Sequence, residues 1–177
     1  MGKSQTGRIL ILCKTYPSPS AKYAETSCVA GMSEAGHLIR LYPVPFRLVA
    51  DEQQFKKWQW ITARIQRSSD DRRVESHRLF VDTIQLGEIV PSSNDWKQRR
   101  QWLAKLPVFE DFDALELARQ QPEGPTLALL RPKQVLGLDI KPVSHPDWTD
   151  EEKAKLLQMQ AQGHLFEETD PDLRMLR

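Results

Sequence analysis

The chain has 177 residues, of which 40% are apolar and 28% are charged, with a formal net charge of +1. These values are typical of a globular protein that buries its own core, and the length predicts one domain or two very small ones. No run approaches the roughly 18 apolar residues that cross a bilayer, and no signal-peptide pattern is present. The sequence therefore indicates a cytoplasmic protein with no membrane association.

The charges are distributed unevenly along the chain. Residues 1–106 hold 17 Lys or Arg and 10 Asp or Glu, for a net charge of +7. Residues 107–177 hold 8 Lys or Arg and 14 Asp or Glu, for a net charge of −6. A basic part beside an acidic part favours a surface that binds polyanions, followed by an acidic tail.

Strands are predicted early in the chain, over residues 8–16, 26–32 and 37–42. The first is a short run of branched apolar residues, as expected for a buried strand. In the third, Arg40 and Tyr42 alternate with apolar positions and therefore share one face. Pro43 and Pro45 end this strand or place it at a sheet edge.

The middle of the chain predicts a short helix over 49–58, a strand over 60–66, a polar turn over 68–73, and one long or two paired strands over 77–90. In the strand over 60–66, Ile61, Ala63 and Ile65 share one face. The opposite face carries Trp60, Thr62, Arg64 and Gln66.

The second half predicts helices over 94–106 and 112–121, strands over 126–130 and 135–143, and a final helix over 150–162. Ser93 is the expected N-cap of the first helix, and Thr149 that of the last. The acidic residues that follow are expected to be loosely held.

Six or seven strands with short connections, and without alternation of strand and helix, predict an α+β fold. We expect an antiparallel β-rich sheet or small barrel with inserted helices and a C-terminal helix. Residues 1–148 would form the β-rich core domain, with a helical insertion at about 93–121, and residues 149–177 the C-terminal helix and acidic tail.

The patterns of well-known metal and catalytic sites are missing from the sequence. A structural zinc site needs about four paired Cys or His ligands, whereas the histidines here are scattered. There is no Walker loop, no GxGxxG and no GxSxG elbow. Cys28 with His37 or His77 could act as a nucleophile and base, but Cys13 and Cys28 are expected to be two buried thiols. No cofactor or metal is expected.

Acidic side chains offer one enzymatic alternative. Glu25, Asp71 and Glu75, with Asp70, could form a carboxylate cluster that binds Mg²⁺ through oxygen atoms, with Lys14 as the electrophile. Such a site would belong to a metal-dependent enzyme acting on nucleotides or nucleic acid. The competing interpretation is a solvated turn in which these groups cap local amides beside an arginine pair.

Basic and aromatic residues indicate nucleic-acid binding more strongly than the acidic residues indicate catalysis. Single-strand binders combine cations that hold phosphates with flat rings that stack on bases. The sequence predicts such an interface from Lys14, Tyr16, Lys22, Tyr23, Arg40, Tyr42, Arg47, Trp60, Arg64, Arg72 and Arg73. The alternative is that the rings are core aromatics with arginine neighbours that extend to solvent. A second basic group, on the helix over 94–106, is expected to be its solvated face and comprises Lys97, Arg99, Arg100 and Lys105.

Three segments carry a resemblance to a known group of proteins: ILCKTYPSPSAKYAETSCVAG, IRLYPVPFR and DDRRVESHR. Over residues 8–78, with a weaker echo at 127–140, the chain resembles uncharacterised bacterial proteins encoded near mobile elements and defence or repair genes. These segments are also similar to the dual OB-fold-containing domain. The resemblance implies an OB-like five-stranded barrel that binds single strands.

The sequence as a whole predicts a nucleic-acid-binding accessory domain, with single-stranded DNA or RNA preferred over duplex. Its setting would be a bacterial defence, mobile-element or repair system. One alternative is the metal-dependent enzyme described above. A second is a protein–protein adaptor that uses the apolar edge over 42–46 and the acidic C-terminal helix.

Overall fold

The structure is a computed structural model that describes residues 3–15, 18–20, 24–45, 49, 51–69, 71–142, 149–151 and 153–154. Its strands are β1 (Gln5–Lys14), β2 (Ser18–Ser20), β3 (Ala24–Ser33), β4 (Leu38–Val44), β5 (Gln59–Arg67), β6 (Ser76–Leu79), β7 (Gln85–Ile89), β8 (Val108–Phe109) and β9 (Leu129–Leu130). Its helices are α1 (Ser93–Leu103) and α2 (Phe112–Arg119), with the 3-10 turns η2 (Asp51–Gln53) and η3 (Val81–Thr83).

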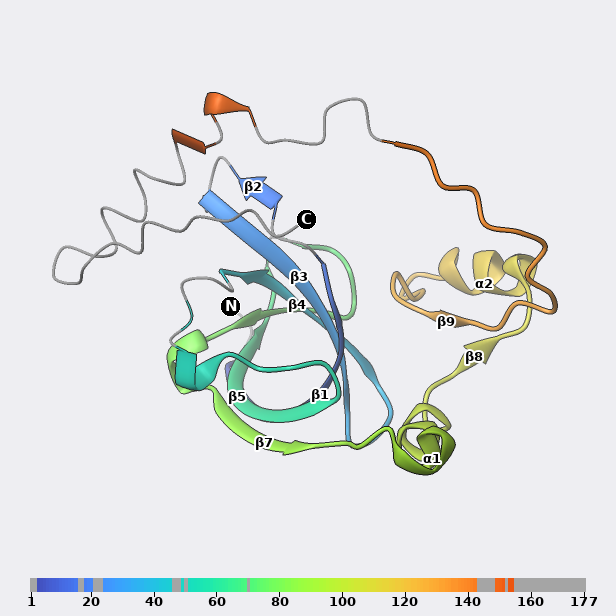
Figure 1. Ribbon diagram of the computed structural model, residues 1–177, viewed down its shortest axis with the longest axis horizontal. Helices are drawn as coiled ribbons and strands as arrows, with labels where there is room; N and C mark the ends of the chain where they lie inside the picture. Colours follow the sequence, from blue (N-terminus) through green and yellow to red (C-terminus); the bar gives the residue numbers. More distant parts are fainter. Residues whose placement is uncertain are drawn as a thin grey trace, which may run out of the picture.

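Five strands close into a small barrel (Figure 1). They follow the order β1-β3-β4-β6-β5, and β5 pairs with β1 to complete the circle. The β4–β6 pairing is parallel, whereas the other barrel pairings are antiparallel. Counted along the chain, the barrel strands run 1-2-3-5-4, an order compatible with an OB-like barrel. The predicted α+β fold with a small barrel is confirmed.

The barrel interior is filled by alternate residues of its strands. Period-two alternation turns every second side chain inward, and burial removes those side chains from water. The inward set includes Ile9, Ile11, Val29, Ile39, Leu41, Ile61, Ala63, Ile65 and Leu79. The predicted alternation along β5 is therefore confirmed on its apolar side.

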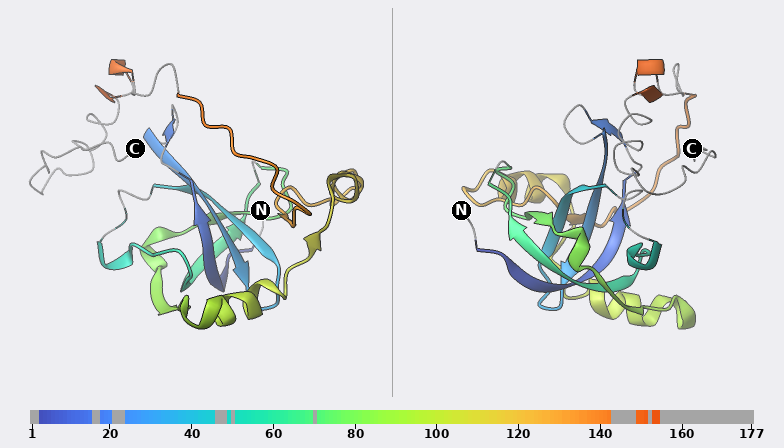
Figure 2. Two further views of the ribbon diagram at one scale, coloured as in Figure 1. Left: turned by 45° about the vertical axis from the view of Figure 1, so that its right-hand side comes forward. Right: turned by 90° about the vertical axis from the view of Figure 1, so that its left-hand side faces the viewer.

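A second core lies on the outer side of the barrel, beneath α1. Its buried members are Leu10, Met32, Trp60, Val90 and Leu106, with Leu38, Trp58, Trp102, Leu103 and Leu129 packed against them. The rings of Trp60 and Trp102 meet edge to face with centroids 4.8 Å apart. Figure 2 shows α1 lying against the barrel. Part of the outer face of β5 is thereby removed from solvent.

The first turn of α1 is not regular helix. Asn94, Asp95 and Trp96 have φ values of 53°, 51° and 62°, in the left-handed region that costs non-glycine residues energy. The N-cap is Ser92, without a side-chain hydrogen bond, so the prediction of Ser93 as a cap is wrong. This conformation accompanies packing of the Trp96 ring edge-on against Trp58, at 5.6 Å.

Two segments in the middle of the chain differ from the prediction. In place of a helix over 49–58, the described residues contain only η2, because Val49 and Phe55 turn into the barrel core. The segment over 77–90 forms β6, η3 and β7. β6 and β7 do not pair with each other. β1 pairs with one edge of β5, and β6 and β7 pair with different parts of its other edge.

The segment after β9 also differs. Only Leu129–Leu130 forms a strand, paired in parallel with β8, and residues 131–142 have no regular structure. The strand expected over 135–143 is therefore wrong for its described residues, which have no strand beside them. At the predicted final helix, the Lys153 amide donates to the Thr149 carbonyl at 3.0 Å. Most of that helix lies outside the described residues.

Both cysteines are free, but neither is fully buried. Cys13 is exposed and Cys28 is half-buried, so the expectation of two core thiols is wrong. The reason is that Cys13 follows a bulge in β1 that turns it away from the barrel interior. Within the described ranges, no helix combines the length and apolarity needed to cross a membrane.

Gly31 lies where β3 packs tightly against β1. A Cβ at this position would lie 2.6 Å from Ile9 Cγ2 and 2.8 Å from the Leu10 carbonyl oxygen. We expect Gly31→Ala to lower the free energy of unfolding by about 1–3 kcal/mol through overpacking, measured by urea denaturation. Gly137→Ala is the matched control, because a Cβ added there would meet no atom within 4 Å. Equal stability of the two variants would contradict this packing.

Candidate nucleic-acid interface

The outer side of β4, β6 and β5 forms one continuous basic face. Arg40 is in register with Ser76 across β4–β6, and Arg78 is in register with Gln66 across β6–β5. These residues and Arg64 alternate with the inward-facing core positions, so they point outward together. We call the outward set of Arg40, Tyr42, Arg64, Arg78 and Phe80 the arginine face.

Each ring of the arginine face is covered by a guanidinium group. Arg40 Cζ lies 4.4 Å from the centroid of Tyr42. Arg64 and Arg78 lie 4.3 and 5.6 Å from that of Phe80. Stacking on a ring favours the cation electrostatically and limits its rotation, while the N–H edge stays open to an acceptor. Arg64 and Arg78 are exposed and can offer that edge to a phosphate.

Arg40 has a different role because its donors are engaged. Its Nη1 donates to Asp71 Oδ2 at 2.8 Å and to Ser76 Oγ at 2.9 Å, and Ser76 Oγ donates to Asp71 Oδ2 at 2.8 Å. The Arg40 side chain is only 11% exposed. Arg40 therefore fixes the loop that contains Asp71 to the face of β4.

Asp71 is held in its ionised form. Burial would raise its pKa, but hydrogen bonds from the Arg73 amide and the Ser76 hydroxyl, with the charges of Arg73 and Arg40, lower the pKa below the usual value. The Arg73 amide lies 3.1 Å from Asp71 Oδ1. Arg72 and Arg73 themselves are exposed in this loop, at the end of the arginine face.

Glu75 is buried and connects the barrel to the second half of the chain. Its carboxylate accepts hydrogen bonds from the Thr126 amide and hydroxyl, both at 2.8 Å, and from the Leu127 amide at 3.2 Å. Asp71 and Glu75 thus serve separate structural contacts. The Glu25 side chain lies outside the described part, and no three His, Cys, Asp or Glu residues gather as a metal site within it. The carboxylate alternative gains no support.

Two predicted interface residues lie away from the arginine face. Trp60 is 1% exposed beneath α1, so its ring cannot stack on a base, and its prediction as a stacking residue is corrected. Lys14 donates from Nζ to the Phe55 carbonyl at 3.1 Å, near the end of the barrel. Burial, with the charge of Lys57, lowers the Lys14 pKa.

The remaining predicted residues divide into two groups. Arg40, Tyr42, Arg64, Arg72 and Arg73 are brought together by β4, β5, β6 and the loop between the last two. Four others lie outside the described residues: Tyr16, Lys22, Tyr23 and Arg47.

Arg78 and Phe80 belong to the face although the sequence analysis did not select them. The predicted long strand over 77–90 concealed the end of β6 at Leu79. The alternation of Ser76, Arg78 and Phe80 with buried Leu79 was the signal in the sequence. The pairing of Arg78 with Gln66 places this alternation beside β5.

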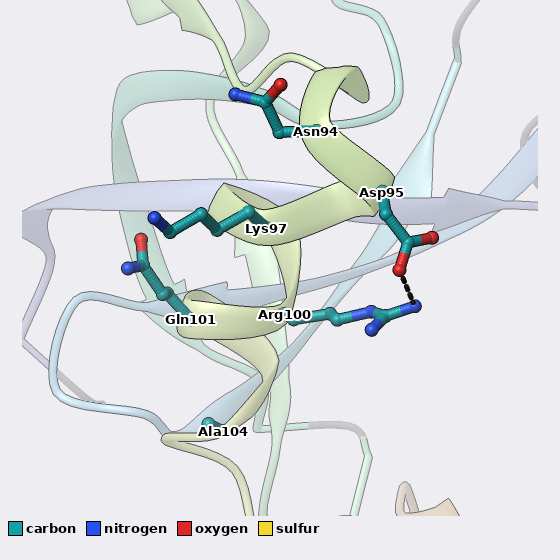
Figure 3. A pocket seen from close by; sticks show the side chains of 6 residues that line it. All are labelled: Asn94, Asp95, Lys97, Arg100, Gln101 and Ala104. Carbon is teal, nitrogen blue, oxygen red and sulfur yellow. Dashed lines mark ion pairs between the residues drawn. The ribbon is translucent and has the colours of Figure 1, made fainter.

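The second basic group, on α1, is only partly a solvated face. Arg99 is half-buried between the rings of Trp58 and Trp96, at 4.8 and 4.9 Å, and Lys105 lies 4.0 Å from the centroid of Trp102. A shallow hollow of about 420 Å³ is lined by Asn94, Asp95, Lys97, Arg100, Gln101 and Ala104 (Figure 3). Arg100 pairs with Asp95 at 2.9 Å in this hollow.

Comparison with known proteins divides the chain into two parts. A family model described as a domain of unknown function (DUF8758) matches residues 5–105, and a second, also a domain of unknown function (DUF8757), matches residues 110–177. The first match covers more than half of the chain, which therefore belongs to that family. No curated protein and no solved structure matches the chain.

Acid should weaken the attachment of the loop through Asp71. Its pKa is lower in the folded chain than in the unfolded chain, so stability is present above the usual Asp pKa of about 3.9 and is lost as the pH falls through the folded value. We expect Asp71→Asn to cost about 1.5–3 kcal/mol at neutral pH and to flatten the acid dependence of unfolding. Asp113→Asn, on exposed α2, is the control. If the stability of Asp71→Asn fell with decreasing pH as it does in the unmodified protein, Asp71 would not be the group whose protonation weakens the fold.

Loss of the Glu75 carboxylate should release the segment at 126–127. In Glu75→Ala, the amides of Thr126 and Leu127 lose a charged acceptor, and a hydrogen bond to a charged group contributes about 1.5–3 kcal/mol. We expect faster hydrogen exchange at 126–130, while β1 and β5 stay protected. Glu75→Gln keeps one acceptor oxygen and should restore part of the protection. Uniform destabilisation of the barrel would oppose a local role.

Proposed function

We propose that this chain is a nucleic-acid-binding accessory module that holds single-stranded DNA or RNA on the arginine face. The observation that carries the proposal is the convergence of Arg64, Arg78 and two guanidinium-covered rings on one outer surface. Cations that follow phosphates beside rings that accept bases are what a single-strand site requires. We place this function in the cytoplasm, within a bacterial defence, mobile-element or repair system.

The fold supports the location of the site. OB-like barrels bind oligonucleotides on the face of their second and third strands and with the loops between strands 1 and 2 and strands 4 and 5. Here β4 is the third barrel strand and carries Arg40 and Tyr42. The loop between the fourth and fifth strands carries Arg72 and Arg73.

Single strands are favoured over duplex because the site contains rings. Tyr42 and Phe80 are half-buried, so part of each residue stays exposed beside the guanidinium group that stacks on its ring. Bases in a duplex are already stacked and do not present their faces. The exposed arginines would bind either form through its phosphates, with an affinity that falls as salt rises.

The adaptor alternative relied on an apolar edge over 42–46, and the described residues of that edge support it less well. Val44 is buried, Pro43 and Pro45 are half-buried, and Phe46 lies outside the described residues. That edge therefore offers no continuous apolar surface among the residues described.

The deciding experiment measures binding of labelled single-stranded and duplex DNA and RNA by fluorescence anisotropy over a salt series. Each phosphate that a protein neutralises on a single strand adds about 0.7 to the slope of log affinity against log salt, so we expect Arg64→Ala/Arg78→Ala to reduce that slope by about 1.4. Arg119→Ala, an exposed arginine of α2, should leave the slope unchanged. Salt-independent binding, or no binding of any of the four nucleic acids, would overturn the proposal.

A further inference from the structure

Residues 135–140, the apolar arm, expose an unusual amount of apolar surface. Val135, Leu136, Leu138 and Ile140 are 77–88% exposed. Single exposed apolar residues are normal on a protein surface, but contiguous apolar patches mark interaction sites. In Figure 1 the arm is part of the orange trace that leaves β9 and runs toward the top of the picture.

The backbone of the arm is also unpaired. Arg131 donates its amide to the Phe109 carbonyl at 2.9 Å, and residues 132–142 make no further backbone hydrogen bond to any residue that the structure describes. Leu136, Leu138 and Ile140 alternate with small or polar residues, which is the pattern of a strand with one apolar face. The arm therefore has the sequence of a strand but pairs with no strand among the described residues.

The matching unpaired element is the edge of β7. Within the described part, β7 pairs only with β5, which leaves its second edge open. All its residues are exposed, including Leu86 at 40% and Ile89 at 48%. An open edge with apolar side chains is a template for another strand.

Placement favours a second copy as the source of that strand. The arm leaves the barrel on the side away from its own β7 (Figures 1 and 2). Because one chain supplies both the strand and the edge, reciprocal exchange closes a two-fold dimer.

We propose that the apolar arm of each chain pairs as an added strand with the open edge of β7 in a second copy. The inference rests on the exposed arm and the open edge, and it is independent of nucleic-acid binding.

The test is the mass of the full chain in solution by light scattering over a range of concentrations. We expect a dimer whose dissociation constant rises by about tenfold or more in Leu136→Asp/Leu138→Asp, which removes the apolar face of the arm. Leu86→Lys, which places a charge on the edge, should have the same effect. Phe112→Asp alters an equally exposed apolar residue of α2 and should leave the dimer intact.

Mixing the two variants distinguishes reciprocal strand exchange from nonspecific association. The arm variant keeps its edge and the edge variant keeps its arm, so the mixture should form a heterodimer although each alone is monomeric. Hydrogen exchange at 135–140 should slow on dimerisation. A protein that stays monomeric at all concentrations would overturn the proposal. If the monomer also shows slow hydrogen exchange at 135–140, the arm packs within its own chain instead. A dimer unaffected by both variants also overturns it.

Discussion

The pairing of β1 with β5 decides which residues of the barrel meet water. It closes the sheet on itself, so that alternate side chains of the barrel strands are committed to the interior and the others to the outside. The outer positions are then divided by α1, which covers Trp60 and its neighbours. What remains uncovered on β4, β6 and β5 is the basic surface. The arginine face is thus a consequence of barrel closure and of where α1 packs.

The sequence predicted what depends on local alternation. The strand at β1 follows from a run of branched apolar residues, whereas the strands at β4 and β5, and the shared face of Arg40 and Tyr42, follow from period-two patterns. It could not predict Trp60, because an outward ring is buried only when a distant helix covers it. It also missed Phe80, whose position depends on a strand ending at Leu79. Residues 135–140 have a strand pattern without a partner strand, and the pattern alone cannot reveal this.

The charge asymmetry and the two family matches divide the chain at nearly the same place. The basic part ends at residue 106, and the matches meet between residues 105 and 110. The structure places α1 on one side of that point and β8 on the other. Charge, family match and secondary structure thus divide the chain into two units near residue 106. The acidic unit keeps the total charge near neutral.

Glu75 couples the two units across this boundary. Its backbone carbonyl accepts from the Arg40 amide at 2.8 Å, while its carboxylate receives three donors from residues 126–127. A chain cut at residue 105 would keep every barrel strand, yet it would uncover this carboxylate and remove Leu106 and Leu129 from the outer core. The Glu75 carboxylate therefore ties residues 126–127 to the barrel, and substitutions on either side of the boundary are constrained by this one contact.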